Sequence, residues 1–430
     1  MTGKNSGPLK IIQQIPKTLP AYQEDLERIK SLLKTGGSLA VLFVDAGWMN
    51  KIEQMFGRKV YGEVLESLIR LLVSMRGKEI RADDLLSVYG IEGEQFLIFL
   101  SRKREDRSFY SSDLETLSHR VSAFLNRELV KTVQAYLMVR PKITVGHAIA
   151  LYNPLIQEER QIYKLLEDAK EMARYQRFRH DMKNKEKIQE LILKESITTH
   201  FQPIVSIETF ELLGYETLSR GPAGTDYEAP SYLFEMAHEA ELGFELDRVC
   251  RRKAFNSASN VHPDHSLFVN CLASAIHDPD FRGESLEPLL GGQKLLPSQI
   301  VMEISERDAI RNYETFRKAA EIYRKMGFGI AVDDIGTGYS SLETVVELCP
   351  DFIKLDISMV RSIDKNLIKQ ELIQAILRLA GSMKSKVIAE GIETREELET
   401  LVRLKVPYGQ GFFIGHPGPK PIEPGRHKRP

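Results

Sequence analysis

Cysteine is scarce in this sequence, and the few cysteines that occur exclude a zinc site of the CxxC type. The 430 residues contain only Cys250, Cys271 and Cys349, which lie far apart along the chain. Their odd number and wide spacing suit a reducing compartment better than an oxidising one. We therefore expect a cytoplasmic protein.

Long apolar runs and an excess of charge are also absent. No stretch approaches the roughly 18 apolar residues that span a bilayer. Residues 1–12 lack the basic region and apolar stretch of a signal peptide. Lys and Arg number 59 against 60 Asp and Glu, so no bulk field attracts a nucleic acid polymer or an anionic membrane. We expect a small ligand as partner, with no nucleic acid polymer and no membrane.

The length allows two or three domains, and the pattern along the chain suggests where they lie. Residues 1–35 are expected to form a polar arm and an amphipathic helix. Strands and helices alternate across residues 36–176, which predicts an α/β or α+β domain. The expected strands are Ser38–Val44, Gln95–Leu100, Ala135–Val139 and Ile143–Leu151, and the expected helices are Val60–Met75, Asp113–Asn126 and Glu158–Tyr175. Residues 177–194 are rich in Lys and Glu and predict a helical linker, although such charge runs are by default solvated helical faces.

The C-terminal half, residues 195–418, alternates short apolar runs with helical patterns. This alternation predicts a (β/α)₈ TIM-type barrel; residues 419–430 form a basic, Pro-rich tail. The expected strands are His200–Ile207, Leu212–Leu218, Ser266–Val269, Gln299–Ile304, Gly329–Val332, Phe352–Leu355, Lys386–Ala389 and Gly409–Ile414. The expected helices include Tyr232–Glu239, Glu245–Ser257, Tyr313–Met326, Ser341–Leu348, Leu367–Ser382 and Glu396–Leu404, and Thr394 with Glu397 fits a capping box for the last of them.

Polar and ionisable residues recur at the C-terminal ends of these expected strands. In such a barrel the C-terminal strand ends converge on one mouth. Any single residue of this kind is more often a solvated strand end, but the whole set is poorly explained by chance. The set is Glu216, Asn270, Glu303, Asp333, Asp334, Lys354, Glu390 and Gln410.

Five carboxylates and one amide oxygen form a hard, oxygen-rich set without cysteine, which suits Mg²⁺ or Mn²⁺ rather than zinc or copper. Crowded carboxylates repel one another and raise their pKa values unless cations neutralise them. Two ions about 3.5–4 Å apart, bridged by Asp333, would hold phosphate oxygens and create a hydroxide nucleophile. Lys354 could orient the water or stabilise developing charge; a structural salt bridge is the alternative.

Eight motifs along residues 187–418 carry a family resemblance: FQPIV (201–205), YETLSR (215–220), FVN (268–270), MEISE (302–306), DDIGTGYSSL (333–342), IKLD (353–356), AEGIE (389–393) and QGFFIGHP (410–417). Together they resemble the EAL-domain family of cyclic di-GMP phosphodiesterases. The signature tripeptide reads Glu216-Thr217-Leu218, with Thr in place of Ala at a position that is not a ligand. The resemblance implies hydrolysis of cyclic di-GMP to linear pGpG with two Mg²⁺ or Mn²⁺ ions.

The same resemblance implies a role for each matched residue. Glu216 and Lys354 would be catalytic, with Lys354 beside the nucleophilic water, and Gln202, Arg220 and Gln410 would face the substrate. Glu306 would brace the loop 334–341, which couples the site to the surface of a homodimer formed through this domain. The metal ligands implied are Glu216, Asn270, Glu303, Asp333, Asp334 and Glu390.

Residues 36–176 resemble a degenerate GGDEF domain. Asp45 matches the metal-binding aspartate of that family, but Glu53 and Gly62 replace an Asn and an Asp. The turn at 90–96 does not read GGDEF, so we expect a regulatory domain without cyclase activity.

Arg81 and Asp84 match the RxxD spacing of the inhibitory site in the GGDEF family. A surface ion pair explains the same spacing equally well.

No member of the implied site is missing, which favours an enzyme. Receptors of this family, which bind without hydrolysis, usually lack several of these residues. The alternatives that stay open are a receptor that signals through the linker and an enzyme for another cyclic dinucleotide.

Overall fold

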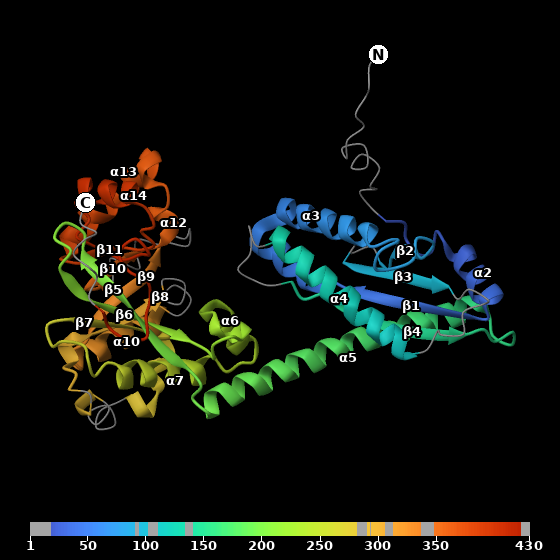
Figure 1. Cartoon of the computed structure of the whole chain (residues 1–430), viewed down its shortest axis with the longest axis horizontal. Helices are drawn as coiled ribbons and strands as arrows, with labels where there is room; N and C mark the ends of the chain where they lie inside the picture. The colour runs from blue at the N-terminus through green and yellow to red at the C-terminus, as the bar shows by residue number, and fades with distance from the viewer. Residues whose placement is uncertain are drawn as a thin grey trace, which may run out of the picture. The chain divides into compact units, whose positions relative to one another are not determined.

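The computed structural model describes residues 19–90, 94–101, 111–133, 141–281, 290–292, 294–305, 313–336 and 348–422. The chain divides into two compact units, Met1–Lys183 and Asn184–Pro430 (Figure 1). The boundary falls inside the helical linker expected at 177–194. No helix in the described ranges combines the length and the apolar composition that crossing a membrane requires.

The first unit is built on a four-stranded sheet. Its strands are β1 (Ser38–Asp45), β2 (Leu85–Val88), β3 (Gln95–Ser101) and β4 (Thr144–Leu151), in the order β2-β3-β1-β4. Each neighbouring pair is antiparallel. The short β2 was not predicted, because four residues carry too little periodicity. The strand expected at 135–139 lies outside the described residues.

Helices cover both faces of this sheet (Figure 1). All eight residues of β1 are buried, and alternate side chains enter different cores because strand side chains alternate between faces. Leu42 packs in the core that includes α3 (Asn50–Ser74) and α4 (Ser111–Val133), whereas Val41 packs against α2 (Leu26–Gly36) and α5 (Glu158–Leu193). The helix expected from Val60 begins earlier, at Asn50, and continues across a non-helical Gly57.

Helix α5 is one continuous element, Glu158–Leu193, of 36 residues. The sequence predicted a helix to about residue 176 followed by a separate linker, but no break occurs between them. Its first half packs on the first unit through residues such as Ile162 and Ala169, and Ile188 and Leu191 pack within the second unit. At about 1.5 Å of rise per residue the helix is about 54 Å long.

The second unit contains a closed eight-stranded barrel in the order β10-β11-β12-β5-β6-β7-β8-β9, which confirms the expected barrel. Its strands are β5 (Thr198–Ser206), β6 (Leu212–Arg220), β7 (Ser266–Asn270), β8 (Ile300–Ser305), β9 (Gly329–Ile335), β10 (Phe352–Leu355), β11 (Lys386–Ala389) and β12 (Tyr408–Gly409).

One strand departs from the parallel arrangement, since β5 runs antiparallel to both β6 and β12. The connection at 207–211 is of hairpin length, whereas a parallel crossover needs about a dozen residues or more. The first strand therefore enters the barrel in the reverse direction, and its N-terminal half lies at the mouth.

Helices surround the barrel, and an apolar layer fills it. Thr394 and Glu397 form the capping box predicted for α14. The barrel interior holds Ile204, Phe268, Val301, Ala331, Phe352 and Ile388. The α-helices are α6 (Pro230–Glu239), α7 (Gly243–Ser257), α10 (Tyr313–Lys325), α12 (Ile357–Val360), α13 (Leu367–Met383) and α14 (Arg395–Arg403). Short 3₁₀ helices in the described part of this unit are η2 (Asp226–Glu228), η3 (Ala273–His277), η4 (Pro279–Phe281), η6 (Pro297–Gln299) and η7 (Ile363–Lys365), and the first unit contains η1 (Gly47–Met49). The helix expected at 341–348 falls almost entirely outside the described residues.

Candidate functional site at the barrel mouth

The polar residues of the mouth continue the inward-facing stripe of each strand. Side chains two residues apart on a strand share a face, and the interior residues Val301, Ala331, Phe352 and Ile388 are each followed two positions later by an ionisable residue. The strands thus place one polar layer directly above the apolar layer. Its members on these four strands are Glu303, Asp333, Lys354 and Glu390.

Lys354 occupies the centre of this layer. Its side chain is fully buried, and its ammonium Nζ lies 2.6 Å from Glu390 Oε1 and 2.8 Å from Glu303 Oε1. Glu216 Oε1 and Asp333 Oδ1 lie 3.4 and 3.5 Å from the same nitrogen. One cation therefore faces four carboxylates, so Lys354 makes more than the single salt bridge considered as an alternative from the sequence.

Two amides fix the orientation of Glu216. Gln410 Nε2 donates to Glu216 Oε2 at 2.5 Å and to Glu390 Oε1 at 3.2 Å. Asn270 Nδ2 donates to Glu216 Oε1 at 3.1 Å. The structure thus brings residues from β6 and β7 and from the segments directly after β11 and β12 into one hydrogen-bonded group.

Burial and mutual repulsion shift the pKa values of these carboxylates. Burial raises the pKa of Glu303 well above its usual value, with Lys354 opposing the shift and Glu216 and Asp333 adding to it. Burial also raises the pKa of Glu390 and of Asp333. The pKa of Glu216 is lowered, because Lys354 and the hydrogen bonds from the two amides together outweigh its burial.

The donor set fits divalent cations. Ligand oxygens of Glu216, Glu303 and Asp333 lie within 4.8 Å of one another. Despite the ion pair with Lys354, neither buried carboxylate oxygen of Glu303 makes a well-aligned hydrogen bond within the described part of the chain. Buried polar atoms are costly without partners, and hard oxygen donors of this kind suit Mg²⁺ or Mn²⁺.

The other residues expected at the site are placed less centrally. Gln202 is buried opposite Glu216 in the β5–β6 pair and donates to Gly415 O at 3.2 Å. Arg220, half-buried at the end of β6, donates to its neighbour Ser219 O at 3.0 Å. Asp334 has a left-handed backbone, φ 64°, and lines the cavity described below. Glu306 lies outside the described residues.

A cavity of about 480 Å³ opens beside the carboxylates. Glu216, Asn270, Glu303 and Asp334 form its polar side. Its other walls include residues that sequence reasoning did not single out: Phe234, Asp247, Cys250, Cys271 and Leu272. Asp247 and Cys250 belong to α7, and no local pattern marks them as facing a mouth formed by other strands.

In the first unit, Asp45 has a partner on each carboxylate oxygen. Gly47 N donates to Oδ1 at 2.9 Å, and Arg177 Nη2 of α5 forms an ion pair with Oδ2 at 2.9 Å. An arginine therefore lies where the GGDEF resemblance implies a metal ion.

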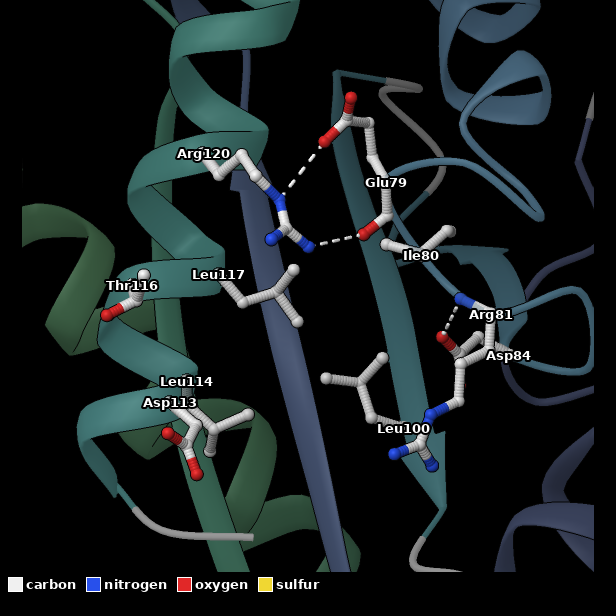
Figure 2. A pocket seen from close by; sticks show the side chains of 10 residues that line it. All are labelled: Glu79, Ile80, Arg81, Asp84, Leu100, Asp113, Leu114, Thr116, Leu117 and Arg120. Atoms are coloured by element: carbon white, nitrogen blue, oxygen red, sulfur yellow. Dashed lines mark hydrogen bonds and ion pairs between the residues drawn. The ribbon is translucent and has the colours of Figure 1, made fainter. Parts of the chain in front are cut away.

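Arg81 and Asp84 line a second cavity, of about 450 Å³, between the segment after α3 and helix α4 (Figure 2). Asp84 is buried and accepts a hydrogen bond from Arg81 N at 2.8 Å. Burial raises the pKa of Asp84 to about 6. Arg120 reaches from α4 to Glu79, with its Nε 3.0 Å from Oε2. Figure 2 shows these groups around a floor that includes Leu100 and Leu117.

Comparison with known families identifies the second unit. The EAL domain model matches residues 185–417, so the chain belongs to the EAL domain family. This confirms the resemblance stated from the motifs; the GGDEF resemblance of residues 36–176 stays a prediction.

Individual relatives agree with this assignment. The probable cyclic di-GMP phosphodiesterase PdeB of Escherichia coli is 31% identical over 240 residues, covering 54% of this chain and 45% of that protein. The bifunctional diguanylate cyclase/cyclic di-GMP phosphodiesterase MucR of Pseudomonas aeruginosa is 24% identical over 416 residues, covering 91% of this chain and 58% of MucR.

A solved structure, the PaMucR phosphodiesterase in complex with c-di-GMP, superposes with a TM-score of 0.50 at 26% identity, covering 55% of this chain and 98% of that one. This chain spans about half the length of the curated relatives it matches.

Proposed function

We propose that this chain hydrolyses cyclic di-GMP to linear pGpG at the barrel mouth, with divalent cations. The observation that carries the proposal is the group of four carboxylates around Lys354, one side of which faces the 480 Å³ cavity. The names of the EAL relatives and the c-di-GMP complex of PaMucR support the same substrate.

The residues at the barrel mouth have different proposed roles in hydrolysis. When bound, two Mg²⁺ or Mn²⁺ ions would polarise phosphate oxygens and acidify a bound water. Gln410 and Asn270 hold the Glu216 carboxylate in a fixed orientation. Lys354 orients the nucleophilic water and offsets charge that develops on phosphate, and Gln202 and Arg220 contact the substrate. The proposed ligands are Glu216, Asn270, Glu303, Asp333, Asp334 and Glu390.

Incubation with cyclic di-GMP and Mg²⁺ or Mn²⁺, followed by chromatography, tests the proposal. Formation of pGpG is the expected result, and EDTA should abolish it. Tight binding without product would instead identify a receptor that signals without turnover. Faster turnover of another cyclic dinucleotide under the same conditions would identify that dinucleotide, and not cyclic di-GMP, as the preferred substrate.

A homodimer formed through the EAL domain is part of the proposal. Helix α13 carries an exposed apolar stripe: Leu367 is 75% exposed, Ile368 82% and Leu372 43%. A contiguous apolar stripe on a surface helix is typical of an interaction site. We expect Ile368→Glu to lower the mass of the full chain measured by light scattering; an unchanged mass would place the contact elsewhere. Glu306 and the loop 334–341 are proposed to couple this surface to the site.

We further propose that the first unit regulates the second and synthesises nothing. Helix α5 runs without a break from one unit into the other, and a helix transmits orientation better than a flexible tether. Removing residues 1–180 should leave hydrolysis in place. Its rate should change by about 5–150-fold, because typical coupling energies between two sites are about 1–3 kcal/mol. Cyclic di-GMP synthesis from GTP by the full chain would contradict the degenerate interpretation.

The cavity lined by Arg81 and Asp84 is proposed to bind a nucleotide, as the RxxD spacing suggested. The two arginines that line it, Arg81 and Arg120, supply the positive charge that a phosphate needs. Equilibrium dialysis should find two classes of cyclic di-GMP site in the full chain and one in Arg81→Ala. Equal stoichiometry in both proteins would leave the surface ion pair as the explanation.

A further inference from the structure

A chain of buried charges lies directly behind the candidate metal ligand Asn270. Asp247 and Arg251 are one turn apart on α7, and Asp278 lies between η3 and η4; their exposed fractions are 5%, 2% and 0%. Arg251 Nε donates to Asp247 Oδ2 at 2.7 Å, and its Nη2 donates to Asp278 Oδ2 at 2.9 Å. The guanidinium also lies 4.5 Å from the centre of the Phe281 ring. Arg251 therefore holds Asp247 in one orientation.

The second oxygen of Asp247 fixes the backbone that follows β7. Leu272 N donates to Asp247 Oδ1 at 3.1 Å, and the preceding Cys271 N donates to Glu303 O at 2.9 Å. The segment after Asn270 is thus tied on one side to α7 and on the other to β8. Since Asn270 is the last residue of β7, this segment sets the direction of its side chain.

The direction of the Asn270 amide matters for cation binding. Its Nδ2 donates to Glu216, so its Oδ1 is the atom that would bind a cation. Asp247, Leu272 and Asn270 line the same cavity. Charge-assisted contacts of this kind orient ligands in metal sites, and their loss typically costs 10–100-fold in metal affinity or activity.

We propose that Asp247 is a positioning residue for Asn270, which it acts on through Leu272 and the backbone after β7. The inference rests on the proposed function, because Asn270 is a cation ligand only if the mouth holds cations. Both carboxylate oxygens of Asp247 are engaged, by Arg251 and by Leu272 N, so Asp247 is assigned no direct contact with substrate or cation.

The experiment measures Mn²⁺ binding to the full chain by calorimetry without substrate, together with the Mg²⁺ dependence of hydrolysis. Asp247→Asn keeps an acceptor for Leu272 but loses the ion pair with Arg251; Asp247→Leu loses both. We expect affinity for Mn²⁺ to fall about 10-fold in Asp247→Asn and further in Asp247→Leu. Asp280→Asn is the matched control, since its side chain is 63% exposed and its ion pair with Arg248 is long, 3.8 Å.

A double-mutant cycle separates positioning from general packing. If Asp247 acts through Asn270, then Asp247→Asn should lower Mn²⁺ affinity much less in an Asn270→Ala background than in the wild type. Equal losses in both backgrounds, or wild-type affinity in a folded Asp247→Asn chain, would overturn the inference while hydrolysis by the wild type stands. Absence of Mn²⁺ binding by the wild type would overturn the proposed function and this inference together. If Asp247→Leu fails to fold, Asp247→Asn and the double-mutant cycle still test whether Asp247 acts through Asn270.

Discussion

Replacing Glu303 by glutamine should abolish hydrolysis yet make the cation-free protein more stable. Glu303 is 1% exposed, and burial holds its pKa well above the usual value. A carboxyl whose pKa is higher in the folded than in the unfolded state contributes stability below the unfolded pKa, and this contribution is lost as the pH rises through the folded value. Ionisation of Glu303 therefore opposes folding.

The size of this gain in stability depends on the carboxylates that remain around Lys354. Glu303→Gln removes one of the four carboxylates around the Lys354 ammonium. The other three remain, with Glu390 at 2.6 Å and Glu216 and Asp333 within 3.5 Å, so the substitution leaves no buried cation unpaired. Replacing buried ionic groups by neutral groups of similar volume is often neutral or stabilising. We expect about 1–2 kcal/mol of added stability in EDTA, or a rise in Tm of about 2–8 °C for a unit of this size.

Divalent cations should make the wild type more stable than Glu303→Gln, the reverse of the order in EDTA. A ligand present at 100 times its Kd stabilises the folded state by about 2.7 kcal/mol, and the wild type should gain this in Mg²⁺ whereas Glu303→Gln should gain little. Thermal unfolding of both proteins in EDTA and in Mg²⁺ is the assay, with Glu314→Gln as a control because that side chain is 69% exposed. A variant less stable than the wild type in EDTA, or one with the same Mg²⁺ shift, would refute the reasoning.

Three other predictions follow from the same structure. Glu216→Ala should lower hydrolysis about 10³-fold or more while the chain stays folded, because a lost ligand removes several kcal/mol of charge stabilisation; unchanged turnover would exclude Glu216 as a ligand. Ca²⁺ should bind but fail to support hydrolysis, because it takes about 6–8 ligands at about 2.3–2.6 Å and displaces the nucleophile; comparable rates would count against a compact two-ion site. Asp84→Asn should stabilise the chain above pH 6 but not below pH 4, because the folded pKa of Asp84 is raised from 3.8 to about 6; thermal unfolding at pH 4 and 7.5 checks this, and a difference that does not change with pH would disprove it.

The mouth residues were predictable because strand geometry is regular. Phe352–Leu355 and Lys386–Ala389 have the same bounds in the sequence prediction and in the structure. With a period of two, the polar residue two positions after each interior residue has to face inward. Lys354 and Glu390 could therefore be assigned to one site before any contact was known.

Contacts between distant elements could not be read in the same way. The bond from Leu272 N to Asp247 joins residues that are 25 positions apart, in a helix and in a loop. Asp247 looks in the sequence like any acidic residue on an amphipathic helix, and its burial depends on how α7 packs on the barrel. The ion pair between Arg177 and Asp45 is hidden for the same reason.

The amino-acid sequence by itself determined the barrel and the residues at the ends of its strands, since alternation and motif order are local properties of the chain. Only the tertiary structure decided that β5 enters antiparallel, that one ammonium faces four carboxylates and that α5 continues unbroken into the second unit. Those features depend on distances between segments remote in sequence, and these distances are set by packing rather than by local periodicity.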